Sequence, residues 1–241
     1  MKRFPLVTAH TGCMGLPDHS IASLQTALAY GVDIYEDDVR VTQDGELVLA
    51  HDDEVQLANG RLGSVAGMKW AELSGQAAEP LVSLEYVLRI VKESGIRMNL
   101  DIKTASSLQP LFILIESLDM VDQVILSGCN YEAACLADGL SHHVNKLLNV
   151  DAASFQSMSY TDAVLQACEH SRKAGCFGLN VPYCLVRTEL LERAEAECLD
   201  VYVWTVSDEA DMRLMAELGV ASITTRNVDR LMEVRKEWER L

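Results

Sequence analysis

The sequence predicts a single (β/α)₈ TIM barrel with a small insertion between the second and third β/α units. Its 241 residues are close to the roughly 250 that are typical of this fold. Strand-like and helix-like hydrophobic periods alternate along the chain in about eight units. The competing doubly wound sheet is disfavoured, because no G-x-G-x-x-G follows the first strand-like segment. We therefore expect one domain over residues 1–241, with an irregular insertion over residues 52–80.

The expected elements follow one another with short connections. The first helix should begin after Ser20, a good N-cap, and end at Gly31. A turn at Asp44-Gly45 separates two strand-like runs, and four glycines mark the expected insertion. The strand-like segments are 4–10, 33–41, 46–52, 96–103, 123–129, 144–150, 176–183, 201–208 and 221–227. The helix-like segments are 20–31, 81–95, 108–118, 131–140, 160–175, 187–199, 209–219 and 228–241.

Composition and charge exclude several classes of partner. The formal net charge of −16 argues against nucleic acid and anionic membrane surfaces, which both favour a basic face. Apolar runs such as "PLFILI" are far shorter than the roughly 20 residues of a membrane span, so we expect no stable membrane anchor. The N-terminus does not resemble a signal peptide, and the seven cysteines contain no C-x-x-C pair. We expect a cytoplasmic protein with reduced thiols.

Three acidic residues fall late in strand-like segments, where a barrel places its chemistry. Glu36 and Asp38 are two positions apart, so their side chains point to the same side of one strand. Asp101 lies at a matching depth in another strand and would add a third oxygen ligand. Such a set suits Mg²⁺ or Ca²⁺. The alternative is a group of salt-bridged or solvated acids, and the sequence offers no explanation for Asp37, which should point towards the helices.

Two histidines stand at strand ends beside these acids. His10 ends the first strand-like segment, and His51 ends the run that follows the Asp44-Gly45 turn. Imidazole titrates near neutral pH, so both are candidates for general acid and base. Either one alone could be a structural histidine, and we interpret the remaining four as structural: His19, His142, His143 and His170.

Several motifs resemble, in order and spacing, those of the glycerophosphodiester phosphodiesterases. They are "AHTG", "DIYEDDVRVTQDGELVLAHDD", "MNLDIK", "VYVWTVSD" and "GVASITTRN", and they span essentially the whole chain. The resemblance implies a TIM barrel with a small insertion after the second unit. It also implies one divalent cation held by Glu36, Asp38 and Asp101, with Mg²⁺ or Ca²⁺ expected and Mn²⁺ as a further candidate.

The resemblance also implies a reaction on a small-molecule phosphodiester. His10 and His51 match the family's acid–base pair: one takes the proton of the glycerol 2-hydroxyl, which attacks phosphorus, and the other protonates the departing alcohol. Water then opens the cyclic phosphate to glycerol 3-phosphate. Lys103 matches a lysine that contacts a phosphate oxygen, and Trp204 matches an aromatic residue of the pocket wall. Soluble barrels of this type often dimerise, so a homodimer is a candidate assembly.

The sequence departs from the family pattern in one subsite. Thr11 replaces an arginine, and a single hydroxyl replaces a bidentate, charged contact to phosphate. "PDHS" replaces P-E-N-T, and Asp101 is one methylene shorter than the usual glutamate. We expect altered substrate preference or weaker phosphate binding at Thr11. Two alternatives stay open: a phosphodiesterase or lyase for another lipid-derived headgroup, and a catalytically weak barrel that binds a phosphorylated ligand.

Overall fold

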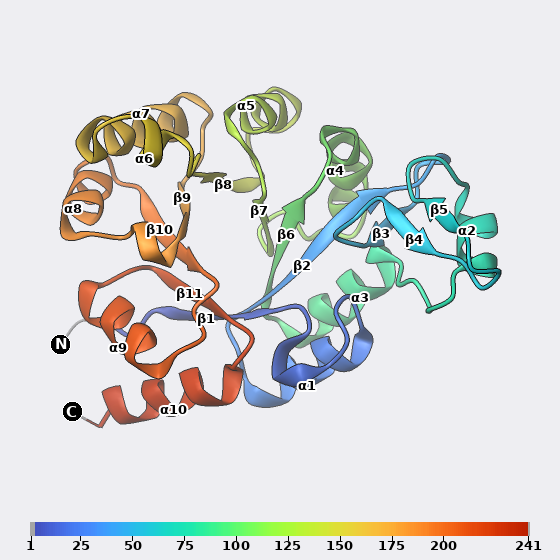
Figure 1. Cartoon of the computed structure of the whole chain (residues 1–241), viewed down its shortest axis with the longest axis horizontal. Helices are drawn as coiled ribbons and strands as arrows, with labels where there is room; N and C mark the ends of the chain where they lie inside the picture. Colours follow the sequence, from blue (N-terminus) through green and yellow to red (C-terminus); the bar gives the residue numbers. More distant parts are fainter. Residues whose placement is uncertain (1–2, 241) are drawn as a thin grey trace.

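The computed structural model describes residues 3–240 and contains a closed parallel barrel (Figure 1). Its nine-stranded sheet consists of eight parallel strands and an antiparallel one, β3 (Leu47–Leu49), which pairs with β2. The barrel closes because β1 pairs with both β2 and β11. The predicted (β/α)₈ fold is confirmed. The parallel strands are β1 (Leu6–His10), β2 (Ile34–Val41), β6 (Arg97–Ile102), β7 (Val124–Ser127), β8 (Asn145–Asn149), β9 (Gly178–Pro182), β10 (Asp200–Trp204) and β11 (Ser222–Thr225).

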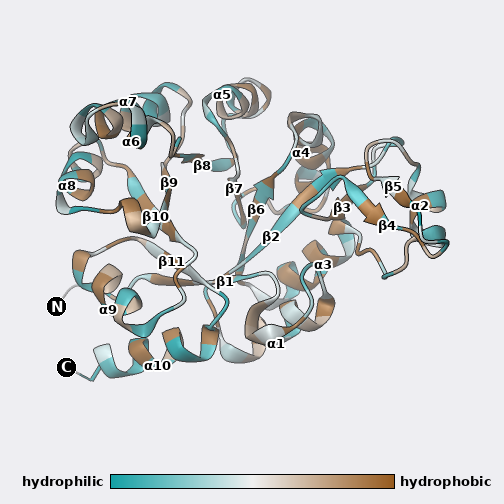
Figure 2. Ribbon diagram, in the orientation of Figure 1, coloured by the Kyte–Doolittle hydropathy of each residue, from teal (hydrophilic) through white to brown (hydrophobic). Residues whose placement is uncertain are grey.

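Helices surround the barrel and turn their hydrophobic sides towards its strands (Figure 2). Ser20 caps α1 by accepting a hydrogen bond from the Ser23 backbone, and Gly31 ends it with a left-handed φ of 73°, as its sequence predicts. The helices are α1 (Ile21–Tyr30), α2 (Trp70–Gln76), α3 (Leu84–Ser94), α4 (Leu108–Ser117), α5 (Tyr131–Leu140), α6 (Ser154–Ser157), α7 (Tyr160–Lys173), α8 (Thr188–Ala196), α9 (Glu209–Leu218) and α10 (Val228–Trp238). Short 3₁₀ turns are η1 (Cys13–Gly15), η2 (Ala105–Ser107) and η3 (Tyr183–Leu185).

The stretch expected to be irregular, residues 52–80, contains regular structure. Strands β4 (Glu54–Gln56) and β5 (Leu62–Ser64) form an antiparallel pair, followed by α2. This unit stands to one side of the barrel, beyond β2 and β3 (Figure 1). It packs against β3 through a small hydrophobic cluster that is separate from the main core and consists of Val48, Ala50, Leu57, Val65 and Leu73. The expectation of an irregular segment was wrong because strands of three residues are too short to show a period.

The interior of the barrel changes from apolar to polar along its axis. Ile34, Ile125, Leu147 and Tyr202 form one buried cluster in the first half or the middle of their strands. Side chains two positions apart on a strand share a face, so Glu36 and Asp38 lie on the same inner face of β2 as Ile34. The hydrophobic layer closes the bottom of the barrel and leaves the C-terminal ends of the strands open for a polar site.

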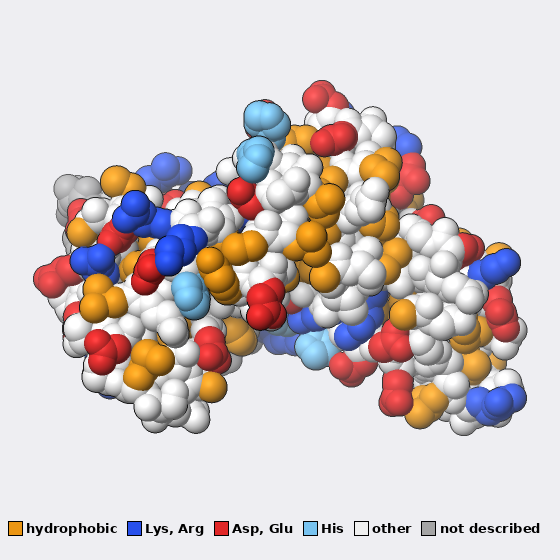
Figure 3. Space-filling view, turned by 90° about the horizontal axis from the view of Figure 1, so that it is seen from above, with side chains coloured by type: hydrophobic (Ala, Val, Ile, Leu, Met, Phe, Trp, Pro, Cys, Tyr) orange, Lys and Arg blue, Asp and Glu red, His pale blue; other side chains and the backbone are white. Residues whose placement is uncertain are grey.

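The surface carries charged side chains of both signs. Acidic and basic side chains are interleaved on the face seen in Figure 3, and Lys and Arg do not gather there into one broad patch. None of the helices within residues 3–240 combines the length and hydrophobicity that crossing a bilayer requires.

Candidate active site

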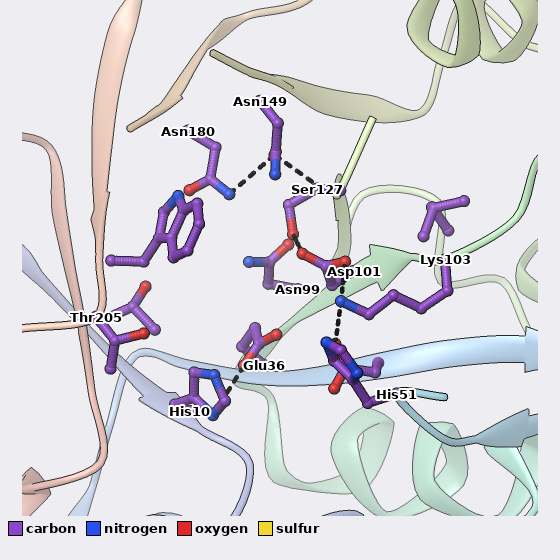
Figure 4. A pocket seen from close by; sticks show the side chains of 15 residues that line it. His10, Glu36, His51, Asn99, Asp101, Lys103, Ser127, Asn149, Asn180 and Thr205 are labelled. Atoms are coloured by element: carbon purple, nitrogen blue, oxygen red, sulfur yellow. Dashed lines mark hydrogen bonds and ion pairs between the residues drawn. The ribbon is translucent and has the colours of Figure 1, made fainter. Parts of the chain in front are cut away.

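A cavity of about 450 Å³ opens at the C-terminal ends of the barrel strands (Figure 4). Parallel strands end at the same rim, so residues far apart in sequence meet there. The cavity brings together seven of the eight residues that the sequence singles out: His10, Glu36, Asp38, His51, Asp101, Lys103 and Trp204.

The strand register places the three acids side by side. Asp38 on β2 pairs with Asp101 on β6, and Glu36 precedes Asp38 by two residues, so it lies on the same face but deeper in the barrel. One oxygen from each of these carboxylates lies within 4.8 Å of the others. Glu36 is only 6% exposed, and its Oε2 atom has no hydrogen-bond partner within the described part of the chain. A buried carboxylate oxygen without a partner is costly, so this geometry fits a cation that all three acids could hold.

The charge balance of the site leads to the same interpretation. Burial raises the pKa of Glu36 well above its usual value, and the neighbouring Asp38 and Asp101 carboxylates raise it further. Lys103 Nζ lies 2.8 Å from Asp38 Oδ1 and 2.8 Å from Asp101 Oδ1. One ammonium group thus faces three carboxylates. Oxygen ligands with excess negative charge are those that Mg²⁺, Ca²⁺ and Mn²⁺ prefer.

The two candidate histidines have different environments. His10 Nδ1 donates to the Thr11 carbonyl oxygen at 2.8 Å, which leaves Nε2 without a proton in the neutral ring. Burial lowers the pKa of His10, so the neutral form is favoured. His51 is well exposed at the rim, and its Nδ1 lies 2.9 Å from the Asp52 carboxylate, which orients the ring.

Thr11 is the predicted residue that the cavity does not include. Its side chain is 1% exposed, and its hydroxyl accepts a hydrogen bond from the His19 backbone at 2.7 Å. The Tyr35 hydroxyl lies 3.4 Å away on the same buried side. We therefore revise the expected substrate contact of Thr11: residues on β1 alternate in direction, so the inward position of His10 turns Thr11 away from the cavity.

An arginine nevertheless stands beside this part of the rim. Arg226 directly follows β11, and its Nη1 atom donates to Asp18 Oδ1 at 2.7 Å. Its charge also helps to lower the pKa of His10, after the larger effect of burial. The sequence alone does not single out Arg226, because no local spacing connects it to Asp18.

Other polar residues of the cavity were also missed. Asn149 Oδ1 accepts hydrogen bonds from the Gly128 backbone at 2.9 Å and from Asn180 Nδ2 at 3.0 Å. Ser127 Oγ lies 3.5 Å from Asp101 Oδ2. Asn99 could have been found, because it precedes Asp101 by two residues and therefore shares its face.

Fold and site together define a (β/α)₈-barrel protein with an acid–histidine site suited to phosphate chemistry. The model of the glycerophosphoryl diester phosphodiesterase family matches residues 10–230. The chain therefore belongs to the glycerophosphoryl diester phosphodiesterase family, a family of enzymes.

Individual relatives align over nearly the whole chain. A glycerophosphodiester phosphodiesterase from Caldanaerobacter subterraneus is 26% identical over 250 residues, covering 96% of this chain and 98% of the relative. The crystal structure of a glycerophosphodiester phosphodiesterase from Thermotoga maritima has a TM-score of 0.80 at 18% identity, covering 98% of this chain and 100% of that one. An Oleispira antarctica phosphodiesterase, solved in complex with the product sn-glycerol-3-phosphate, has a TM-score of 0.79 at 20% identity, covering 97% of each chain.

Proposed function

We propose that this protein hydrolyses glycerophosphodiesters to glycerol 3-phosphate and an alcohol, in a reaction that depends on a divalent cation. The observation that carries the proposal is the buried, unpartnered Glu36 Oε2 atom, which lies beside two further carboxylates and 3.7 Å from His10 Nδ1. Family membership supports the reaction class. The glycerol 3-phosphate complex of the Oleispira relative supports the product.

Glu36, Asp38 and Asp101 would hold the cation, for which Mg²⁺, Ca²⁺ and Mn²⁺ are the candidates. When bound, such an ion supplies positive charge that polarises the phosphate and orients it for in-line displacement.

The histidines would move the protons. His10 has a lowered pKa because it is buried, so its Nε2 atom can take the proton of the glycerol 2-hydroxyl. The resulting oxygen attacks phosphorus, the bond to the alcohol breaks, and His51 gives its proton to the departing oxygen. In the second step the roles reverse: His51 takes a proton from water, the water oxygen opens the cyclic phosphate, and His10 returns its proton to the 2-oxygen.

Two further residues would position the substrate. Lys103 Nζ, which lies between two acids of the site, can donate to a phosphate oxygen at the same rim. Trp204 is 37% exposed and lines the cavity, where its ring can pack against the carbon atoms of the glycerol or the alcohol. We assign no substrate contact to Thr11, whose role is to hold the loop after β1.

Hydrolysis of glycerophosphocholine and glycerophosphoethanolamine tests this proposal. We expect glycerol 3-phosphate with Mg²⁺, Ca²⁺ or Mn²⁺ and none with EDTA. His10→Ala should lower kcat by about 10²- to 10⁴-fold, whereas His142→Ala, at an exposed histidine of the loop after α5, should not. Accumulation of the cyclic phosphate would instead indicate a lyase. Binding of glycerol 3-phosphate without turnover would indicate a catalytically weak barrel. The expected homodimer and the cytoplasmic location stay predictions from the sequence.

A further inference from the structure

Asn99 lines the candidate active site but has no role in the proposed reaction. Its side chain points from β6 into the cavity (Figure 4). It is only 5% exposed, and its Oδ1 atom has no hydrogen-bond partner within the described part of the chain. A buried amide oxygen without a donor is costly. The proposed cation accounts for the unpaired Glu36 Oε2 atom of the same cavity, whereas the Asn99 oxygen still needs a partner.

The neighbouring donors of the cavity are used elsewhere. Lys103 Nζ lies 2.8 Å from an oxygen of Asp38 and 2.8 Å from an oxygen of Asp101. The Ser127 hydroxyl is directed to Asp101 Oδ2, 3.5 Å away. Ionised carboxylates only accept hydrogen bonds. The donor for Asn99 Oδ1 should therefore come from a molecule that enters the cavity.

The strand register places Asn99 close to the part of the cavity where the glycerol group would react. His10 on β1 pairs with Glu36 on β2, and Glu36 pairs with Asn99 on β6. Asn99 precedes Asp101 by two residues, so it lies on the same face but deeper in the barrel. On its other side it pairs with Ile125, which belongs to the buried hydrophobic cluster inside the barrel. Asn99 therefore lies at the closed end of the cavity.

The proposed reaction decides which hydroxyl Asn99 can bind. The glycerol group of a glycerophosphodiester has two free hydroxyls, one at carbon 2 and one at the terminal carbon. The 2-hydroxyl has a single proton, which His10 would take. The terminal hydroxyl keeps its proton throughout the reaction, so it can donate to the neutral amide oxygen of Asn99.

We propose that Asn99 Oδ1 accepts a hydrogen bond from the terminal hydroxyl of the glycerol group and thereby restricts the substrates to fully deacylated glycerophosphodiesters. This inference rests on the proposed function. In a 1-acyl lysophospholipid, an acyl chain esterifies the terminal oxygen. The ester removes the donor and adds a chain where the barrel is closed by Ile125 and its cluster. A substrate that leaves Asn99 Oδ1 buried and unpaired is disfavoured.

The test compares glycerophosphocholine with an analogue in which propane-1,2-diol replaces glycerol, so that only the terminal hydroxyl is missing. With Mg²⁺ or Mn²⁺, the wild-type protein should hydrolyse the analogue with a kcat/KM about 10- to 100-fold lower. Asn99→Leu, of similar size but without polar side-chain atoms, should hydrolyse both compounds equally well. Asn145→Leu, at an exposed position at the start of β8, should keep the wild-type ratio. The wild-type protein should not detectably hydrolyse 1-acyl lysophosphatidylcholine.

Binding of the two reaction products provides a readout that does not need turnover. Calorimetry should show that the metal-loaded wild-type protein binds glycerol 3-phosphate at least about tenfold more tightly than propane-1,2-diol phosphate, and that Asn99→Leu binds both alike. Asn99→Leu removes a buried oxygen that has no partner among the described residues, so it should not lower the melting temperature in EDTA.

Three results would overturn the inference. The first is equal kcat/KM values and equal product affinities for the two compounds in the wild-type protein, a comparison that needs no variant. The second is discrimination that persists in Asn99→Leu. The third is a Mn²⁺ affinity that falls at least about tenfold in Asn99→Leu, which would show that the amide oxygen binds the cation instead. Failure of the proposed function would differ from all three, because the wild-type protein would then hydrolyse neither compound with any of the metals.

Discussion

Replacing Glu36 by glutamine should stabilise the metal-free protein and remove its response to metal. The side chain keeps its size but loses a charge that is 6% exposed and lies beside two other carboxylates. The amide group can also donate to those carboxylates, whereas the Oε2 atom of the wild-type residue has no partner among the described residues. The substitution therefore separates the stability cost of the site from its function.

The magnitude follows from the distances between the acids. Two like charges within 4.8 Å of each other repel by at least about 3.5 kcal/mol at an effective dielectric constant of about 20. Glu36 has two such neighbours, and the Lys103 ammonium, which lies 2.8 Å from each of them, offsets part of this repulsion. We expect Glu36→Gln to raise the free energy of unfolding of the metal-free protein by about 2–4 kcal/mol. For a chain of this length that corresponds to a melting temperature higher by roughly 5–15 °C.

Thermal unfolding in EDTA and in excess Mg²⁺ or Mn²⁺ measures both effects. An ion at 100 times its Kd should stabilise the wild-type protein by about 2.7 kcal/mol, and Glu36→Gln should lose most of this gain. Glu93→Gln, at an exposed position of α3, serves as the control and should change neither value. A metal-free Glu36→Gln protein that melts below the wild type, or one that keeps the full metal-induced shift, would refute the reasoning.

Three further changes test other parts of the structure. Arg226→Ala removes a positive charge that helps to lower the pKa of His10, and it should raise KM for glycerophosphodiesters by about tenfold with a smaller effect on kcat. Steady-state kinetics checks this, and an unchanged KM would show that the Arg226 charge does not act on the substrate. Thr11→Arg should lower the melting temperature instead of tightening substrate binding, since Thr11 is 1% exposed; tighter binding at unchanged stability would show that the side chain reaches the cavity. The Asp138 carboxylate bonds to the buried Lys146, and this bond is the main cause of its lowered pKa. The pair therefore stabilises the fold fully above the ordinary pKa of Asp, about 3.9, and this stabilisation is lost as pH falls through the lowered pKa. Urea unfolding of Asp138→Asn across pH 2–6 should show a shallower acid limb than the wild type, and an identical limb would contradict the assignment.

The fold was predictable because its signals are local and repeated. A strand such as β6 carries its own period, and the alternation along it already places Asp101 and its neighbour Asn99 on one face. The acids and histidines of the cavity were predictable for the same reason, because they lie at or near the ends of such strands. The strands β4 and β5, three residues each, carry too few residues to show any period, and their unit was therefore missed.

The residues that the sequence could not assign depend on contacts between distant segments. Asp37 is the second of four outward-facing positions of β2, where apolar residues are expected, and only the folded loop after β1 brings His19 to it. Arg226 and Asp18 are separated by 208 positions and meet because β1 and β11 are neighbours at the closure of the barrel. The register between strands and the closure of the barrel decide which distant residues meet, and neither can be predicted from the spacing of residues along one strand.

The closure of the barrel also changes the interpretation of Thr11. Gly12 has a φ of 70°, and a Cβ atom there would lie 2.0 Å from Asp18 Oδ1 and 2.6 Å from Arg226 Nη1. The Asp18–Arg226 ion pair thus packs directly on the backbone that follows His10. An arginine, Arg226, therefore lies near His10 although position 11 is threonine, and it reaches this place from the end of β11. Its charge is paired with Asp18, so the Arg226→Ala variant tests whether it acts on the substrate.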